Sequence, residues 1–189
     1  MRYFHSALER FPQYYEAYYH QGIAELKLGK NEEALHSFQM AIDLSDGRYA
    51  QAQFGYALAL GRQGNAEEAE RIVRYGLETE PNVPDGHIVL GLVLLKLNRV
   101  DEAEKSARRG LLLDNPKSGK GYLVLADVDA ARSDYDAQAR DLESYLKLHP
   151  DDANAPLFKA ARDAARRLAA KSAQKSREAG AISVASRTP

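Results

Sequence analysis

The chain has 189 residues, of which 44% are hydrophobic and 28% are charged, a composition that allows a folded core and excludes an intrinsically disordered chain. Its longest apolar stretch, residues 88–95, spans eight residues against the ~20 that cross a bilayer, so we expect no membrane span. With no cysteine, the sequence excludes disulfides, thiolate metal sites and a cysteine nucleophile.

The small formal charge of −1 hides an asymmetry along the chain. Residues 159–178 hold seven basic and two acidic residues, a net charge of +5, so the rest of the chain carries −6. An acidic body argues against broad phosphate binding, and a basic helix face is usually only solvated. We therefore expect no nucleic-acid partner.

Residues 1–13 are the first predicted element. Phe4, Ala7 and Pro12 stand at the same spacing as Phe38, Ala41 and Asp46 further on, which predicts the second helix of an incomplete repeat. Its unmatched apolar face is consistent with a shortened chain, with earlier repeats, with a frayed terminal helix or with a self-association edge that forms a homo-oligomer. No secretory signal is visible, so the cytoplasm is the default compartment.

Four units of the pattern helix, turn, helix, stop follow. Their central turns recur at spacings of 35, 34 and 35 residues, and a breaker such as Pro81 or Pro150 closes each unit. We therefore predict an all-α chain with repeats at 15–49, 50–83, 84–118 and 119–152. The turns are Gly29-Lys30-Asn31, Gly64-Asn65-Ala66, Asn98-Arg99-Val100 and Ser133-Asp134-Tyr135.

Other residues keep step with the turns. A small residue stands seven positions before each turn and predicts a close approach between the two helices of a repeat. A stripe at i, i+4 and i+7 predicts the buried face of each second helix. The small residues are Gly22, Ala57, Gly91 and Ala126, and the stripes begin at Ala34, Ala69, Ala103 and, exceptionally, Gln138.

These residues resemble the tetratricopeptide repeat family over residues 15–152. The resemblance implies a right-handed superhelical solenoid of antiparallel helix pairs, whose first helices line a concave groove that binds a protein or peptide. Carried over column by column, it places in the groove Tyr19, Ile23, Lys27, Phe54, Leu58, Arg62, Ile88, Leu92, Lys96, Leu123 and Asp127.

The expected groove has an apolar floor and a basic margin, which suits an amphipathic helix or an extended peptide with some acidic residues. For Ile88 and Leu92, inside a continuous apolar run, burial in the core is the favoured interpretation. For Tyr19 and Phe54 we expect the groove, since large aromatic side chains are common anchors at interfaces. The Lys and Asn clamp of the chaperone-tail binding subset of the family is absent.

After the repeats, Pro156 opens a predicted capping helix over residues 153–171. Its expected buried side consists of Leu157, Ala160, Ala161, Ala164, Ala165 and Leu168, with arginines on the opposite side. Residues 172–189 have no apolar period, which predicts a disordered tail.

No catalytic pattern emerges from the sequence. The five histidines fall in different repeats without metal-ligand spacing, and Ser118-Gly119-Lys120 lacks the leading glycine of a phosphate-binding loop. We therefore expect no enzyme activity, cofactor or metal site, and interpret the chain as a non-catalytic protein-binding scaffold. The alternative is a structural module that self-associates through residues 1–13.

Overall fold

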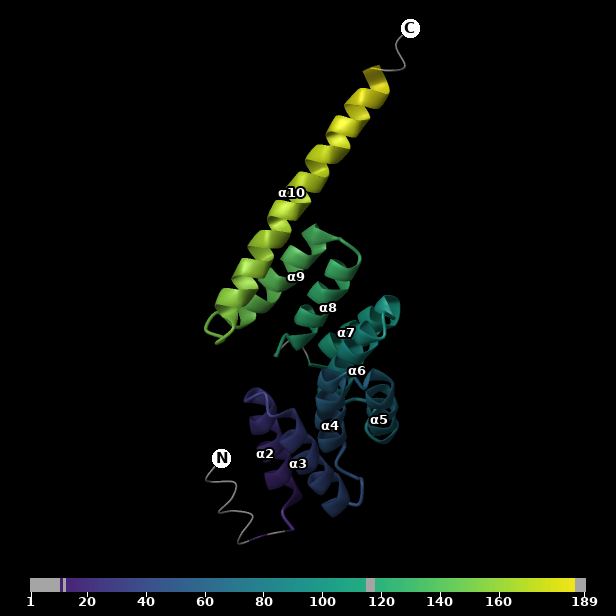
Figure 1. The fold of residues 1–189 in the computed structure, drawn as a ribbon, viewed down its shortest axis with the longest axis vertical. Helices are drawn as coiled ribbons and strands as arrows, with labels where there is room; N and C mark the ends of the chain where they lie inside the picture. The colour runs from purple at the N-terminus through teal and green to yellow at the C-terminus, as the bar shows by residue number, and fades with distance from the viewer. Residues whose placement is uncertain (1–10, 12, 115–117, 186–189) are drawn as a thin grey trace. The chain divides into compact units, whose positions relative to one another are not determined.

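The computed structural model describes residue 11 and residues 13–114 and 118–185, with side chains up to residue 177 (Figure 1). Within these ranges every regular element is a helix. The chain divides into two compact units at residues 116 and 117. The predicted N-terminal half repeat, residues 1–13, lies almost entirely outside the described residues.

The helices follow one another in pairs. Each pair falls inside one of the repeat spans expected from the sequence, and α10 follows alone. In unit 1 the helices are α2 (Tyr15–Lys27), α3 (Asn31–Leu44), α4 (Ala50–Gln63), α5 (Ala66–Thr79), α6 (Pro84–Lys96) and α7 (Val100–Asp114). In unit 2 they are α8 (Lys120–Ala131), α9 (Tyr135–Leu148) and α10 (Ala155–Ala185).

The four turns inside the repeats share one backbone geometry. Gly29, Gly64, Asn98 and Ser133 all have positive φ, from 57° to 94°. The N–H of the following residue donates to a carbonyl five residues earlier, as from Lys30 to Glu25 at 2.9 Å, which is the Schellman arrangement that ends a helix. The predicted turn positions are therefore the points where each first helix stops.

The small residues and the second-helix stripes that were predicted to pack between helices are mostly buried. Gly22 lies against the fully buried ring of Phe38, and a Cβ at this position would stand 2.7 Å from Cε1 of the ring. Ala57, Ala126 and the alanines that open the second-helix stripes of the first three repeats are buried as well. In the fourth repeat Gln138 is half-buried, and the adjacent Ala139 is the buried residue.

Glu25, where the family pattern prefers tyrosine, is a buried carboxylate. It accepts hydrogen bonds from Ser37 Oγ at 2.7 Å and from Gln21 Nε2 at 2.9 Å. These two donors satisfy a charge that burial would otherwise penalise strongly. The departure from the pattern therefore changes local packing but leaves the architecture intact.

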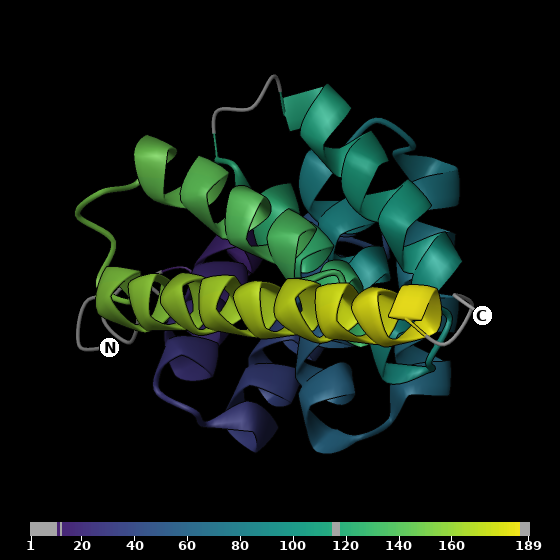
Figure 2. The same ribbon diagram turned by 90° about the horizontal axis from the view of Figure 1, so that it is seen from above.

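The C-terminal helix corrects two expectations. First, α10 continues to Ala185 as one long helix, although we predicted disorder from residue 172 (Figure 2). Residues 172–185 include four alanines together with Gln174, Lys175, Arg177 and Glu178, whose intrinsic helix propensity favours continuation without tertiary packing. Second, the expected buried side is mostly exposed, with Leu157 at 68% and Leu168 at 43%.

A neighbouring face of α10, which shares only Ala165 with the expected side, packs against α9. The ring of Phe158 meets that of Tyr145 edge-on at 5.2 Å, Ala165 is buried, and Arg162 Nη1 lies 2.8 Å from Glu143 Oε2. This ion pair holds the pKa of the Glu143 carboxyl below its usual range. The aromatic contact and the ion pair decided the packed face, and both depend on residues in α9.

Candidate protein-binding face

The first helices of unit 1 form a continuous row. α2 contacts α4, and α4 contacts α6, whereas among the described residues the second helices α3, α5 and α7 do not contact one another. Instead α3 packs against α4, and α5 packs against α6. The row must therefore bend with the first helices on its inside, which makes their free sides one inner face.

Each of these three helices presents the same order of side chains on one stripe, since residues at i, i+7 and i+11 line up along a helix. An acidic or polar residue comes first, then an apolar residue, then a basic one. We call the three stripes together the inner face. They are Glu16–Ile23–Lys27 on α2, Gln51–Leu58–Arg62 on α4 and Asp85–Leu92–Lys96 on α6.

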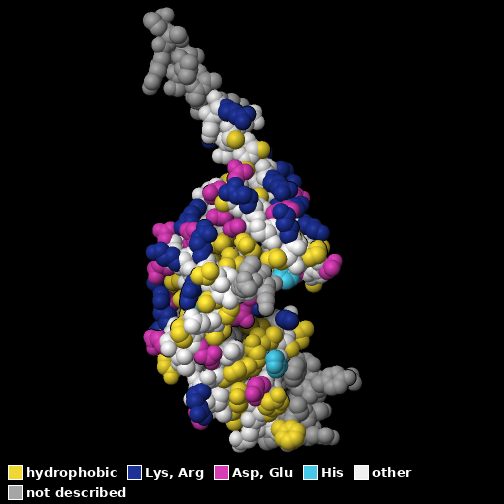
Figure 3. All heavy atoms as spheres, turned by 180° about the vertical axis from the view of Figure 1, so that it is seen from behind, with side chains coloured by type: hydrophobic (Ala, Val, Ile, Leu, Met, Phe, Trp, Pro, Cys, Tyr) yellow, Lys and Arg dark blue, Asp and Glu magenta, His cyan; other side chains and the backbone are white. Residues whose placement is uncertain are grey.

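Four of the expected floor residues are partly open to solvent. Tyr19, Ile23 and Leu58 are half-buried, with one side against the core. Leu92 is half-buried too, although burial in the core was the favoured interpretation for it. Hydrophobic side chains (yellow) also gather into a band in the lower part of the face drawn in Figure 3. Half-buried apolar side chains lose little further entropy when a partner covers them, so they are suitable anchors.

Two expected floor residues are core residues instead. Phe54 is only 2% exposed, and its ring fills the space that the absent side chains of Gly76 and Gly86 leave, so the expectation that it lines the groove is wrong. Ile88 is 7% exposed and packs against Gly110, in agreement with the favoured core interpretation.

The basic margin consists of three exposed residues that differ in their contacts. Arg62 donates from Nη1 to the carbonyl oxygen of Leu26 at 2.8 Å, which ties α4 to the C-terminal end of α2. Lys27 and Lys96 are exposed at the last turns of their helices. The two lysines are therefore better suited to meet an incoming charge than the arginine between them.

Unit 2 presents a different chemistry on its first helix. Leu123 of α8 is half-buried, but the stripe of this helix runs Lys120–Asp127–Ala131, with an acidic residue in the apolar place. Asp127 reaches solvent, and partial burial raises the pKa of its carboxyl. The apolar floor is thus a property of unit 1.

An aromatic cluster borders the stripe of α2 and was not expected from the sequence. Ring centroids lie 5.1 Å apart for Tyr15 and Tyr49, 5.3 Å for Tyr19 and Tyr49, and 6.0 Å for Tyr19 and Phe38. Burial, followed by the neighbouring Tyr19, raises the pKa of Tyr49 to about 12. The run of tyrosines at residues 14, 15, 18 and 19 was the available signal, but Tyr49 lies outside the repeat columns.

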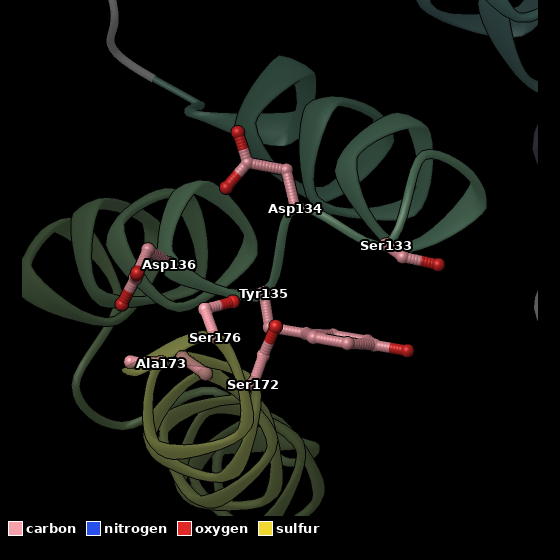
Figure 4. Close-up of a pocket in the computed structure, with 8 residues that line it drawn as sticks. Ser133, Asp134, Tyr135, Asp136, Ser172, Ala173 and Ser176 are labelled. Carbon is pink, nitrogen blue, oxygen red and sulfur yellow. The ribbon is translucent and has the colours of Figure 1, made fainter. Parts of the chain in front are cut away.

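A small pocket of about 220 Å³ lies in unit 2, between the α8–α9 turn and α10 (Figure 4). Ser133, Asp134 and Tyr135 line it from the turn, and Ser172 and Ser176 face them from α10. The side chain of Asp134 accepts a hydrogen bond from the N–H of Ala137 at 3.0 Å and so caps α9. Helix capping therefore explains the presence of this carboxylate without a catalytic role.

Two other kinds of site are absent from the described residues. No group of three or more His, Cys, Asp or Glu residues in the described ranges is placed to hold a metal ion. None of the helices that the structure describes is both long and apolar enough to cross a membrane.

A bent row of helix pairs with an apolar inner face defines a helical repeat protein of the kind that serves as a scaffold for protein–protein contacts. The tetratricopeptide repeat family model matches residues 2–49, 21–84, 56–120 and 88–156. The chain belongs to this family, and its fold is the all-α solenoid expected from the sequence.

A similar solved structure agrees with this assignment, and curated relatives match parts of the chain. A thermophilic TPR protein of Thermus thermophilus is 25% identical with a TM-score of 0.73, over 84% of this chain and 86% of that one. A DnaJ homolog subfamily C member 7 homolog of Schizosaccharomyces pombe is 28% identical over 79% of this chain and 34% of that protein. A Sol locus transcriptional repressor of Clostridium acetobutylicum is 31% identical over 44% of this chain and 26% of that protein. The chain thus spans about a third or less of these two curated relatives.

Proposed function

We propose that the protein is a non-catalytic scaffold whose inner face in unit 1 binds a segment of another protein. The observation that carries the proposal is the threefold repetition of one stripe, in which an apolar residue stands between an acidic or polar residue and a basic residue. Ile23, Leu58 and Leu92 supply three apolar contacts on adjacent helices. A peptide that crosses the helices meets all three.

The charges on the stripes define the partner further. Lys27 and Lys96 stand on one edge of the inner face, and Glu16 and Asp85 lie about three helical turns away on the other edge. A segment with apolar anchors and acidic residues on one side therefore fits in one orientation. Charge complementarity of this kind contributes more to specificity and association rate than to affinity.

The test is selection from a random peptide library displayed on phage, carried out on the full chain. Wild type should enrich peptides with apolar residues flanked by acidic ones. The double variant Lys27→Glu, Lys96→Glu should bind these peptides about tenfold more weakly, because two favourable ion pairs become repulsive. The matched control Arg71→Glu, Lys105→Glu reverses two exposed charges on α5 and α7 and should bind as wild type does.

The outcomes separate the parts of the proposal. If wild type enriches no peptide family, the inner face is not a peptide site. If peptides are enriched but bind both double variants equally well, the inner edge of lysines plays no part in recognition. Circular dichroism of the variants should match wild type, because all four substituted residues are exposed.

A further inference from the structure

In the repeat pattern, the first part of α10 stands where the first helix of a further repeat would stand. The 35-residue spacing takes Leu123 to Phe158 and Ala126 to Ala161. α10 also packs against the preceding second helix, α9, as α4 packs against α3 and α6 against α5. By sequence column and by contact, α10 therefore begins as the first helix of a fifth unit.

The second helix of that unit does not follow within the described residues. The other first helices turn with positive φ, last at Ser133, whereas α10 runs without interruption through Leu168, the corresponding column. In the four repeats the small residue of the first helix is buried, and Gly22 lies against Phe38 of the second helix. In α10 the equivalent Ala161 is exposed.

This arrangement leaves an apolar seam along α10. The seam is the set Leu157, Ala161, Ala164 and Leu168, spaced at i, i+4, i+7 and i+11, which keeps the four side chains on one side of the helix. Leu157 is 68% and Leu168 43% exposed, although both are large apolar residues. The spacing is that of the contact positions of a coiled coil.

We propose that α10 pairs antiparallel with α10 of a second copy of the chain, seam against seam. The seam is symmetric about its own centre. In an antiparallel pair Leu157 of each copy faces Leu168 of the other, and Ala161 faces Ala164. A two-fold axis makes such a surface self-complementary. The small alanines at the crossing point allow the helices to approach closely, and the leucines pack at both ends.

The charges favour the same partner and the same direction. Lys171 and Lys175 continue the seam toward the C-terminal end, where α10 is exposed and rich in basic residues, and dark blue side chains mark α10 in Figure 3. In the antiparallel register they pass the start of the other α10, next to the exposed Asp151. A parallel pair would instead place each lysine beside the same lysine of the other chain. The contact of these lysines with Asp151 therefore favours the antiparallel pair over a parallel one, in which the two segments of charge +5 would lie side by side.

Sedimentation of the full chain over a range of concentrations tests the pairing. Wild type should pass from monomer to dimer, and Leu157→Glu, Leu168→Glu should weaken the dimer at least a hundredfold, since four carboxylates would enter the apolar seam of each dimer. Leu112→Glu is the matched control, because Leu112 is a leucine on α7 that is 72% exposed and lies outside the seam. It should leave the dimerisation constant unchanged.

Cross-linking tests the direction, and the cysteine-free chain allows single cysteines to be placed at will. A mixture of Leu157→Cys and Leu168→Cys chains should form a disulfide-linked heterodimer on mild oxidation. Leu157→Cys alone should not cross-link, because the two cysteines would be about 16 Å apart at 1.5 Å per residue. Cross-linking of Leu157→Cys with itself would establish a parallel pair and overturn the proposal.

Two more results would overturn it. One is a wild-type chain that stays monomeric at every concentration. The other is a dimer that survives Leu157→Glu, Leu168→Glu but disappears when residues 1–13 are deleted, which would place self-association at the N-terminal segment.

A charge-reversal rescue supplies positive evidence. Lys171→Glu should weaken the dimer several-fold, and adding Asp151→Lys to this variant should restore it.

Discussion

The ring of Phe38 allows a quantitative test of how the first two repeats pack. A Cβ added to Gly22 would lie 2.7, 2.8 and 2.9 Å from three carbons of this ring, and one added to Gly55 would lie 2.5, 2.7 and 2.9 Å from it. The ring is fully buried between the two glycines. Because the ring is enclosed on both sides, Gly22→Ala and Gly55→Ala should each push the helix that carries the substitution away from α3.

The expected magnitude follows from two opposing effects. Overpacking a core costs about 1–3 kcal/mol, and replacing glycine by alanine inside a helix gains up to about 1 kcal/mol. Each substitution should therefore lower the free energy of unfolding by about 1–2 kcal/mol. Gly61→Ala is the control, since its Cβ would lie 3.7 Å from Val93 Cγ2 and 4.0 Å from Lys96 Cδ, which are ordinary contact distances. It should stabilise the protein by about 0.5–1 kcal/mol.

The assay is urea unfolding followed by circular dichroism and tyrosine fluorescence, since the chain has no tryptophan. The decisive comparison is the sign of the change at the three glycines. If Gly22→Ala and Gly55→Ala stabilise the protein as much as Gly61→Ala does, the close approach of α2, α3 and α4 around Phe38 is refuted.

Three further predictions concern single contacts. Arg62→Ala removes the hydrogen bond to the Leu26 carbonyl and should cost about 0.5–1.5 kcal/mol in urea unfolding, whereas Lys96→Ala, its counterpart on α6, should change stability by less than about 0.5 kcal/mol. Ser133→Gly should stabilise the chain by up to about 1 kcal/mol, because a φ of 60° is strained for serine and not for glycine; Ser144→Gly inside α9 should destabilise it. Burial and the hydrogen bond to Asp152 raise the pKa of Tyr145 to about 12, so its neutral form stabilises the fold up to pH 10, and this contribution should vanish between pH 10 and 12. Tyr145→Phe should flatten that part of the urea-midpoint profile, and an unchanged profile would contradict the assignment.

The repeat architecture was accessible to sequence reasoning because its signals are local. A turn residue with positive φ, a small residue seven positions earlier and an apolar stripe follow from one helix pair, and they recur four times. Gly29 and Gly64 ended their helices as expected, and Asn98 and Ser133 adopted the same backbone despite their side chains. Repetition strengthened each weak signal.

The features that sequence reasoning missed depend on pairs of distant residues. The packed face of α10 was not that of Leu157 and Leu168, because the ring of Tyr145 and the carboxylate of Glu143 lie on α9 where Phe158 and Arg162 can reach them. Amphipathic periodicity alone could not distinguish the two faces, since alanines occur on both. Helix propensity, rather than packing, extended α10 through residues that carry no apolar period.

The column of Tyr19, Phe54, Ile88 and Leu123 shows why a repeat column does not give one exposure. Phe54 is buried because two glycines, Gly76 and Gly86, leave space for its ring, and Ile88 is buried against Gly110. The stripe of Ile23, Leu58 and Leu92 is half-buried in every repeat of unit 1. Ligand contacts should therefore be sought first on that stripe, and substitutions at Phe54 should act through stability rather than through binding.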